Sequence, residues 1–296
     1  MPTDPSVAVR PRPRLIPAEV DQVESLRVRC NEHEGLDLKL GVASLIPGAG
    51  QLQAPSQFLA YSGDQLAGYC SLDLGGDIEL CGMVHPAQRR HGIGHALLDA
   101  ALAECRRRGT SRVLLICEEA SASGRAFMAA LGVSRAFAEY RMERDVSSPP
   151  LATGSQTVEE RLHTTRAELD DLDAIATVQS AAFGDRSRDV RQMIAQDQRE
   201  PDVSYYLARL GEIPVGSLKV YTTPPRAGIY AFGVVPAHRR RGFGRQILLQ
   251  VIALLGAAGC SRVWLEVDTN NVSAYALYRS AGFCETTTYG YYRLNL

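Results

Sequence analysis

The strongest constraint on this chain is an internal repeat. When the sequence is shifted against itself by 150 positions, residues 84–133 align with residues 234–283 without a gap, and 17 of the 50 pairs are identical. Chance would give about three identities, and a period this long indicates a duplicated domain rather than a solenoid of short units. The sequence therefore predicts two copies of one domain.

Domain boundaries follow from the composition before and between the copies. Residues 145–158 contain few large apolar side chains and many Ser, Pro, Gly and Thr residues, which predicts a linker. Residues 1–14 carry arginines between prolines and are expected to form a flexible tail. The N-terminal copy then spans residues 15–144 and the C-terminal copy residues 159–296, each of a usual domain size.

Charge, hydropathy and cysteine usage exclude several classes of protein. The chain has 32 Lys and Arg residues against 33 Asp and Glu residues, which gives no general attraction to nucleic acid or acidic membrane. No apolar run approaches the roughly 18–20 residues that cross a bilayer, and the first residues lack the apolar stretch of a signal peptide. Seven cysteines without CxxC spacing indicate reduced thiols. We expect a cytoplasmic protein that binds neither nucleic acid nor membrane.

Both copies show the same order of predicted elements. An amphipathic helix, a hairpin of two strands and a third strand ending near a proline precede a long helix, a strand and a last helix. This order predicts an α/β or α+β fold with helices packed on a partly antiparallel sheet. The expected ranges are 18–28, 58–61, 66–72, 78–84, 93–108 and 112–117 in the first copy and 167–183, 205–210, 213–221, 229–235, 243–258 and 262–268 in the second.

A glycine-containing turn between the third strand and the long helix carries the chemical signal. It reads Val84-His-Pro-Ala-Gln-Arg-Arg-His-Gly-Ile-Gly94 in the first copy and Val234-Val-Pro-Ala-His-Arg-Arg-Arg-Gly-Phe-Gly244 in the second. Glycines at a helix start let an anion approach the backbone N–H groups, and the helix N-terminus and the arginines supply positive charge. The turn lacks the Gly-Lys-Ser/Thr of a P-loop and the third glycine of the dinucleotide fingerprint. Its presence in both copies predicts a pyrophosphate site.

The second copy resembles a known family at this turn and beyond it. Arg239-Arg-Arg-Gly-Phe-Gly244 resembles the acyl-coenzyme A signature, Gln/Arg-x-x-Gly-x-Gly/Ala, of the GNAT N-acetyltransferase superfamily, and the similarity continues from Leu265-Glu-Val-Asp to Leu277-Tyr278 and Gly282-Phe283. The tandem layout is similar to that of mycothiol synthase, while the second copy looks like ribosomal-protein alanine N-acetyltransferases. The resemblance implies two tandem domains, each with a mixed, partly splayed sheet and helices on both faces.

The resemblance also implies acetyl-CoA as a co-substrate and no metal. The pantetheine arm is expected between two splayed parallel strands, residues 229–235 and 262–268, with the backbone of Phe232, Gly233 and Val234 as its partner. Asn271 falls where the family places a side chain against the coenzyme. The pyrophosphate is expected in the turn made by Arg239, Arg240, Arg241, Gly242, Phe243, Gly244 and Arg245.

Acetyl transfer to an amine needs a base, an acid and an oxyanion donor. The amine is mostly protonated at pH 7, since its pKa is about 8 for an α-amine and about 10.4 for a lysine. The departing thiolate leaves more readily when it is protonated, and a backbone N–H can stabilise the oxyanion. We therefore expect direct attack in a ternary complex, with no covalent enzyme intermediate.

Tyr278 is the candidate acid and Glu266 the candidate base. A phenol keeps its proton at pH 7 and can donate it to a thiolate. Glu266 lies in an otherwise apolar strand, where a carboxylate is costly unless it is exposed or used, and the resemblance implies the base role for it. Two alternatives stay open: Tyr278 as a packing residue of its helix, and Glu266 as a carboxylate paired with an arginine.

The first copy departs from the second at these positions. Ile116 matches Glu266, Met128 matches Tyr278 and Ser121 matches Asn271, so this half is expected to be catalytically degenerate. Glu118, on the face of Ile116, is a weaker alternative base. The copy keeps a pyrophosphate turn with Arg89, Arg90, Gly92 and Gly94, so acetyl-CoA binding and a purely structural turn both stay open.

The predicted function is transfer of an acetyl group from acetyl-CoA to a primary amine by the second copy. The alternative is a non-catalytic acyl-CoA-binding or sensing module. The acceptor stays open between small molecules (thiol-sugar amines, aminoglycosides, polyamines) and a peptide α-amine, as do the acyl-chain preference and the oligomeric state.

Histidines and tyrosines elsewhere give weaker signals. His91 and His95 have metal-compatible spacing but no third ligand nearby, so we expect them to be solvated or to face phosphate. Tyr289, Tyr291 and Tyr292 alternate as in a closing strand, and they either line the amine site or pack.

Overall fold

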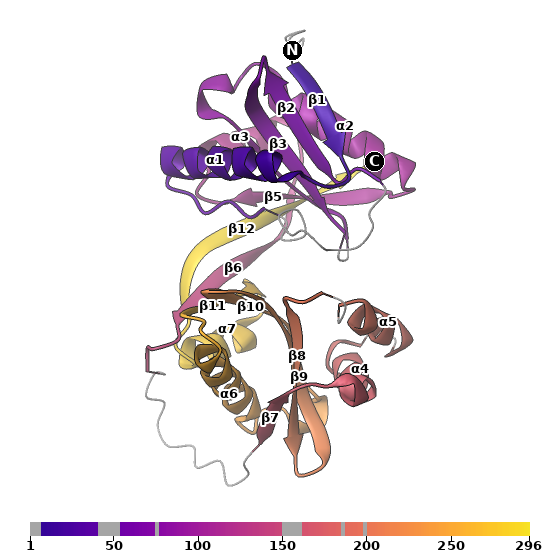
Figure 1. Cartoon of the computed structure of the whole chain (residues 1–296), viewed down its shortest axis with the longest axis vertical. Helices are drawn as coiled ribbons and strands as arrows, with labels where there is room; N and C mark the ends of the chain where they lie inside the picture. Colours follow the sequence, from indigo (N-terminus) through magenta and orange to yellow (C-terminus); the bar gives the residue numbers. More distant parts are fainter. Residues whose placement is uncertain (1–6, 41–53, 75–76, 150–161, 185–186, 198–199) are drawn as a thin grey trace. The chain divides into compact units, whose positions relative to one another are not determined.

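The chain divides into two compact units that do not follow the sequence in order. Unit 1 is Met1–Ala138 with Thr287–Leu296, and unit 2 is Glu139–Thr286. In this computed structural model the described residues are 7–40, 54–74, 77–149, 162–184, 187–197 and 200–296 (Figure 1). None of the helices in these ranges is long and apolar enough to cross a membrane.

Unit 1 is a mixed sheet with helices on both faces. Its strands lie in the order β1-β2-β3-β4-β5-β12, and only β4 and β5 are parallel. One face packs on α1, and the other packs on α2 and α3. The elements are β1 (Val7–Arg12), α1 (Pro17–Glu34), β2 (Gln57–Ser62), β3 (Gln65–Asp73), β4 (Glu79–Val84), α2 (Ile93–Arg107), β5 (Arg112–Glu118), α3 (Ala122–Ala130) and the later part of β12 (Cys284–Asn295).

Unit 2 repeats this plan. Its strands lie in the order β6-β11-β10-β9-β8-β7, and α6 and α7 cover one face of the sheet while α4 and α5 cover the other (Figure 1). The elements are the later part of β6 (Arg135–Asp145), β7 (His163–Arg166), α4 (Leu172–Phe183), α5 (Ser187–Asp197), β8 (Val203–Leu210), β9 (Ile213–Thr223), β10 (Arg226–Val234), α6 (Phe243–Ala257), β11 (Arg262–Asp268) and α7 (Val272–Ser280).

The sequence predicted this fold class correctly. Each expected range overlaps a helix or strand of the expected type, and the tandem mixed sheets with helices on both faces are confirmed. The long helices end at Gly109 and Gly259, which have φ values of +75° and +90°, the left-handed conformation that ends a helix. The helix expected over 167–183 begins later, at Leu172, and α5, β1, β6 and β7 were not predicted.

The last strands of the two copies are exchanged. β6 and β12 occupy equivalent places in the repeat, yet residues 139–145 of β6 pair with β11 in unit 2, and residues 289–295 of β12 pair with β5 in unit 1. Met142 is fully buried in the core of unit 2, and Tyr289 and Tyr291 are 1% exposed in unit 1. The expected domains 15–144 and 159–296 therefore differ from the compact units, because each sheet takes its final strand from the other copy.

The structure corrects the prediction for part of the expected tail, and it describes little of the expected linker. Val7–Arg12 form edge strand β1, which pairs antiparallel with β2, so the flexible-tail interpretation is corrected for these residues. An ion pair from Arg12 to Glu19 at 2.9 Å joins this strand to α1. Most of the expected linker, residues 150–158, lies outside the described residues.

Replacing Met142 with Ala tests whether β6 belongs to the core of unit 2. Truncating a fully buried Met typically costs about 2–5 kcal/mol of stability, because the lost contacts leave a cavity. Native-state hydrogen exchange of the full chain should speed up in the β11 amides and stay unchanged in β2. Met193→Ala, on the exposed side of α5, is the matched control. Equal effects of the two substitutions on β11 exchange would contradict the exchanged-strand core.

Candidate active site

Two parallel strands of unit 2 separate where the chemistry was expected. β10 and β11 pair from Arg226↔Arg262 to Ile229↔Leu265, and no pair follows within the described strands. Beyond Ile229, the described part of β10 forms no further strand pair with β11. Backbone N–H and C=O groups on such an edge can bind a ligand that lies between the strands. This opening is called the unit 2 splay below.

β10 contains a β-bulge beside the unit 2 splay. Its pairing with β9 shifts between Tyr230 and Gly233, and Ala231 has a φ of +46°, which non-glycine residues rarely adopt. A bulge leaves an extra residue outside the regular ladder, so backbone groups around Phe232 are turned out of the pairing pattern. The expected backbone partners of the pantetheine arm, residues 232–234, therefore lie at and beside an irregular stretch.

The turn that follows β10 has the geometry of an anion-binding loop. Arg240 and Gly242 have left-handed φ values of +61° and +78°, and α6 begins directly after Gly242. No side chain caps the α6 N-terminus. The first N–H groups of α6 are thus available to a phosphate, and the helix dipole favours negative charge there.

The arginines of the turn have different roles. Arg239 donates to the carbonyl oxygens of Val234 and Ala182, at 2.9 and 2.8 Å, so its guanidinium holds the turn in place. Arg240 is exposed, and Arg241 lies over the Phe243 ring at 4.9 Å from the centroid.

Gly244 lies close to Leu277 of α7, and Asn271 stands at the start of that helix. A Cβ on Gly244 would come within 3.0 Å of Leu277. Asn271 is the N-cap of α7, where its Oδ1 accepts a hydrogen bond from the Ala274 N–H at 3.1 Å. Only the amide nitrogen of Asn271 then remains for a ligand contact.

Tyr278 lies on the α6/α7 side of the splay. It is 9% exposed, belongs to the core cluster of Leu265 and Val267, and its ring meets Phe283 at 6.2 Å. Burial raises the pKa of Tyr278 to about 12. The phenol is therefore protonated at neutral pH and can act only as a donor of its proton.

Glu266 lies on the other face. Because side chains alternate along a strand, and Leu265 and Val267 pack under α6 and α7, Glu266 points to the side covered by α4 and α5. It is also the first residue of β11 beyond the last pair with β10. Its Oε1 lies 3.4 Å from Nη1 of Arg141, which sits directly opposite it on β6.

Arg141 and Trp264 complete this surface and were not predicted. The Arg141 guanidinium lies 3.5 Å from the centre of the Trp264 ring, and its side chain is 12% exposed. Trp264 in turn meets Tyr230 edge to face at 5.2 Å. The tandem repeat gave no signal for Arg141, since β6 was not expected in this unit.

The arrangement places a carboxylate and a phenol on opposite sides of one opening. A ligand threaded between β10 and β11 would meet Glu266 towards α4 and α5, and Tyr278 towards α6 and α7. The arginine-paired carboxylate, one of the two alternatives for Glu266, is present as an ion pair with Arg141. The packing alternative for Tyr278 also has support, since its ring is part of the core.

Unit 1 keeps the opening and the turn. β4 and β5 pair only at Glu79↔Leu114 and Leu80↔Leu115 before they separate. Arg90 and Gly92 have φ values of +70° and +81°, α2 starts without a side-chain cap, and the Arg89 Nε donates to the Val84 carbonyl at 3.2 Å. These features match those of unit 2 one for one.

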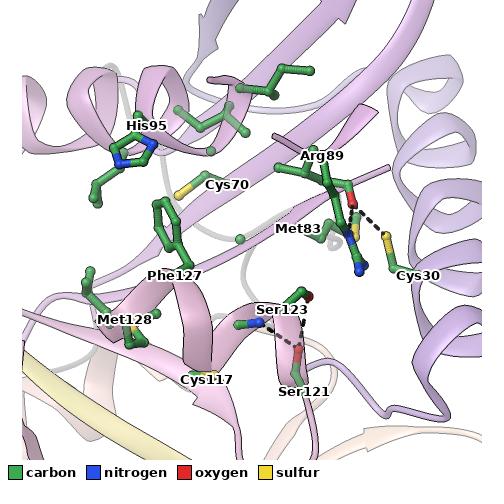
Figure 2. Close-up of a pocket in the computed structure, with 18 of the residues that line it drawn as sticks. Cys30, Cys70, Met83, Arg89, His95, Cys117, Ser121, Ser123, Phe127 and Met128 are labelled. Carbon is green, nitrogen blue, oxygen red and sulfur yellow. Dashed lines mark hydrogen bonds between the residues drawn. The ribbon is translucent and has the colours of Figure 1, made fainter. Parts of the chain in front are cut away.

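The opening of unit 1 is a cavity of 690 Å³ (Figure 2). Phe127 and Met128 of α3 line it together with Cys117 of β5 and His95 of α2. Ile116 and Met128 stand where unit 2 has Glu266 and Tyr278, and the pairing of β3 with β4 continues without a bulge. Unit 1 thus has a cleft without a carboxylate or a phenol at these two positions and without the irregular backbone of unit 2.

The remaining predicted residues have structural roles. Glu118 is buried and accepts hydrogen bonds from the Thr287 hydroxyl at 2.7 Å and the Asp37 N–H at 2.9 Å. Tyr289 and Tyr291 are buried in unit 1, and Tyr292 packs on its core, so the closing strand is confirmed and these side chains pack.

The histidines show no sign of a metal site. His91 is exposed and His95 meets the Phe127 ring at 5.0 Å. Within the described ranges, no group of three His, Cys, Asp or Glu residues could hold a metal ion.

Comparison with known proteins identifies the family. Residues 22–133 and 169–283 each match the Acetyltransferase (GNAT) family. The chain is 31% identical over 290 residues to a mycothiol acetyltransferase of Thermobispora bispora, covering 93% of this chain and 92% of that one. It is also 31% identical over 225 residues to a mycothiol acetyltransferase of Clavibacter michiganensis, covering 74% and 72% of the two chains.

Solved structures show the same tandem fold. A GCN5-related N-acetyltransferase from Sphaerobacter thermophilus superposes with a TM-score of 0.78 at 20% identity, covering 99% of this chain and 97% of that one. A tandem GNAT protein from the clavulanic acid biosynthesis pathway gives 0.70 at 19% identity, with 98% of both chains covered. The chain belongs to the GNAT acetyltransferase family, as a tandem member that transfers an acetyl group from acetyl-CoA to a primary amine.

Proposed function

We propose that unit 2 carries out the acetyl transfer, with Glu266 as base and Tyr278 as acid, and that the acceptor is a small-molecule amine. The observation that carries this proposal is the position of Glu266, the first residue of β11 beyond its last pair with β10, with Tyr278 on the opposite face. Unit 1 has Ile116 and Met128 at these two positions.

The coenzyme fits the residues of unit 2. The open edge of β10 offers backbone partners to the amide-rich pantetheine arm, and the uncapped N-terminus of α6 offers N–H groups to the pyrophosphate. Arg240, Arg241 and Arg245 supply the counter-charge, while Arg239 holds the turn. Acetyl-CoA supplies the activated acyl group.

Glu266 accepts the proton that the amine must lose. A protonated amine has no lone pair for attack, so the carboxylate takes up its proton directly or through one water. Arg141 holds the carboxylate from the neighbouring strand, and its guanidinium is itself fixed against Trp264. Arg141 is therefore a positioning residue for the base.

Tyr278 holds the proton that the departing thiolate needs. The raised pKa of its phenol keeps that proton in place until a stronger base is formed beside it. The backbone N–H groups around the bulge at Phe232 are the donors for the oxyanion of the addition step.

The acceptor is proposed to be the amine of a thiol sugar. Two relatives that cover most of this chain carry the name mycothiol acetyltransferase. The surface around Glu266 combines a charged Arg141 with the aromatic rings of Trp264 and Tyr230. Such a mixture of charge and aromatic surface suits a small polar molecule.

Tyr278→Phe tests the acid. We expect kcat to fall by about 10²- to 10⁴-fold, because the thiolate then leaves without general-acid help. The KM for acetyl-CoA should change little, since the ring remains. Tyr275→Phe is the matched control on the same helix, because the Tyr275 hydroxyl bonds to Glu285 instead. Release of free thiol is the measurement, and an undiminished rate in Tyr278→Phe would remove the assignment.

The pH dependence of the parent protein tests the same residue independently. A pKa of about 12 for Tyr278, raised by burial, keeps the phenol protonated through pH 10. We therefore expect kcat to show no loss from this group between pH 8 and about 10. An alkaline loss centred near pH 10 that disappears in Tyr278→Phe would mean that the phenol titrates as if exposed.

Substitutions at Glu266 and Arg141 test the base and its support. Glu266→Gln should lower kcat/KM for the amine by about 10²-fold or more, with acetyl-CoA binding unchanged. Arg141→Lys keeps the charge but not the flat contact with Trp264, and should lower kcat while leaving the KM for acetyl-CoA unaffected. Glu285→Gln is the carboxylate control. If Glu266→Gln matches this control in rate, Glu266 serves only as the partner of Arg141.

A panel of amines tests the acceptor. We expect the highest kcat/KM for a thiol-sugar amine, above peptide α-amines, amino sugars and polyamines. Preference for a peptide would instead favour the ribosomal-protein acetylases as functional relatives. Binding of acetyl-CoA without transfer to any amine would favour the non-catalytic module.

A further inference from the structure

We propose that Lys219 and Asp197 of unit 2 form the end of the acceptor site that selects a polyhydroxylated amine. The inference deepens the proposed function, on which it rests for the place where the amine reacts, Glu266. It assigns the selection of the acceptor to two residues that take no part in the chemistry.

Lys219 stands in register with the proposed base across the sheet. Lys219 of β9 lies directly opposite Tyr230 of β10. Tyr230 and Glu266 are each the first residue of their strand beyond the last pair that joins β10 to β11. Because neighbouring strands lie about 4.8 Å apart, Lys219 is about 10 Å or more from Glu266 across the sheet.

These side chains share the face of the sheet that α4 and α5 cover. Tyr205, directly opposite Lys219 on β8, packs in the core cluster under these two helices. Residues directly opposite each other on neighbouring antiparallel strands point to the same face. Lys219 and Tyr230 therefore lie on the same face as Glu266.

The side chains of Lys219 and Asp197 form a polar pair that has hydrogen-bonding groups left for a ligand. The Lys219 Nζ donates to Asp197 Oδ2 at 2.8 Å, and the Tyr205 hydroxyl donates to the same oxygen at 2.5 Å. Within the described ranges Asp197 Oδ1 accepts no hydrogen bond, and the ammonium uses one of its three N–H groups. The two side chains are 25% and 19% exposed, so a ligand can reach them.

The charges on this sheet are paired, which favours an acceptor that is neutral apart from its amine. Lys219 is balanced by Asp197, and Arg226 and Arg262 both bond to Glu143. An anionic acceptor would need an unbalanced cation, whereas a hydroxyl group needs a donor and an acceptor side by side. The pair supplies both, and hydrogen bonds to charged partners are the stronger kind.

Aromatic rings lie between this pair and the proposed base. Tyr230 meets Trp264 edge to face at 5.2 Å. A Cβ on Gly228 would come within 2.5 Å of the Trp264 ring, so this glycine lets the ring lie over β10. Flat apolar rings suit the C–H faces of a sugar-like ring, whose hydroxyl groups then reach Lys219 and Asp197.

Lysine is rare in this chain. Lys39 and Lys219 are the two lysines among its 32 Lys and Arg residues. An ammonium is a compact donor whose N–H groups rotate, whereas a planar guanidinium matches carboxylates and phosphates. A lysine at this position therefore suits hydroxyl groups, and its rarity makes Lys219 observable in the intact protein.

Calorimetry on the full chain saturated with CoA tests the selection without transfer. The probes are aminoethyl glucoside and aminoethyl cyclohexyl ether, which share the amine, the spacer and a six-membered ring but differ in hydroxyl groups. We expect the glucoside to bind about tenfold or more tightly than the ether, because the ether makes no hydrogen bonds to the charged pair.

A substitution at Lys219 locates this preference. Lys219→Met removes the donors and keeps a similar side-chain length, so it should bring the ratio of the two affinities close to one. Arg191→Met is the matched control, because it breaks an exposed ion pair of α5 with Asp173 of α4. The control should keep the ratio of the parent.

Lysine-selective ¹³C labelling tests the contact in the parent protein. Aminoethyl glucoside should shift the ¹³Cε signal of Lys219. It should leave the signal of Lys39, which lies in unit 1 and donates to the Tyr291 hydroxyl. The spectrum of Lys219→Met assigns the two signals.

Three results would overturn the proposal. The first is that the parent protein binds the two probes equally, or binds neither. The second is a preference for the glucoside that survives in Lys219→Met, and the third is an unmoved Lys219 signal at saturating glucoside. None of these measurements needs acetyl transfer, so they distinguish a failure of the selection from a failure of Glu266 as the base.

Discussion

The separation of two parallel strands is the constraint on which the rest of each unit depends. Four residue pairs join β10 to β11, and beyond them the described parts of the two strands form no further pair with each other. That arrangement is costly in a closed core and useful only where something else is bound. The Gly-x-Gly turn follows directly at the end of β10, so the opening proposed for the pantetheine arm lies beside the helix N-terminus proposed for its phosphates.

Because the last strands are exchanged, the proposed base and an arginine that pairs with it come from different copies of the repeat. Arg141 lies on β6, which ends the first copy in sequence, yet it pairs with Glu266 of the second copy across the β6–β11 ladder. A C-terminal copy cut at the repeat boundary would lack both the strand and the arginine. A cut at the linker would therefore separate the proposed base, Glu266, from Arg141, the residue that is proposed to position it.

The sequence predicted the elements that depend on neighbouring residues better than the elements that depend on pairing between distant residues. The turn, its long helix and the flanking strands were readable because glycine spacing, a following proline and apolar periodicity all act within a few residues. The bulge at Ala231, the edge strand of residues 7–12 and the place of β6 depend on partners far away in sequence, which neither periodicity nor composition specifies. Asn271 falls between these two groups. The family resemblance singled it out as a coenzyme contact, but the sequence did not predict that it caps α7.

The two units share the turn and the strand opening but differ at the positions of the proposed acid and base. The turn geometry of Arg90 and Gly92 matches that of Arg240 and Gly242, which shows that the phosphate end is held by the backbone and by the arginine that ties it to the preceding strand. The reacting end is proposed to depend on side chains, and unit 1 has Ile116 in place of the proposed base Glu266 and Met128 in place of the proposed acid Tyr278. On the face where unit 2 has Glu266 and Arg141, unit 1 has the segment 36–40, which is hydrogen-bonded to Tyr289 and Tyr291. This packing adds buried apolar surface to unit 1.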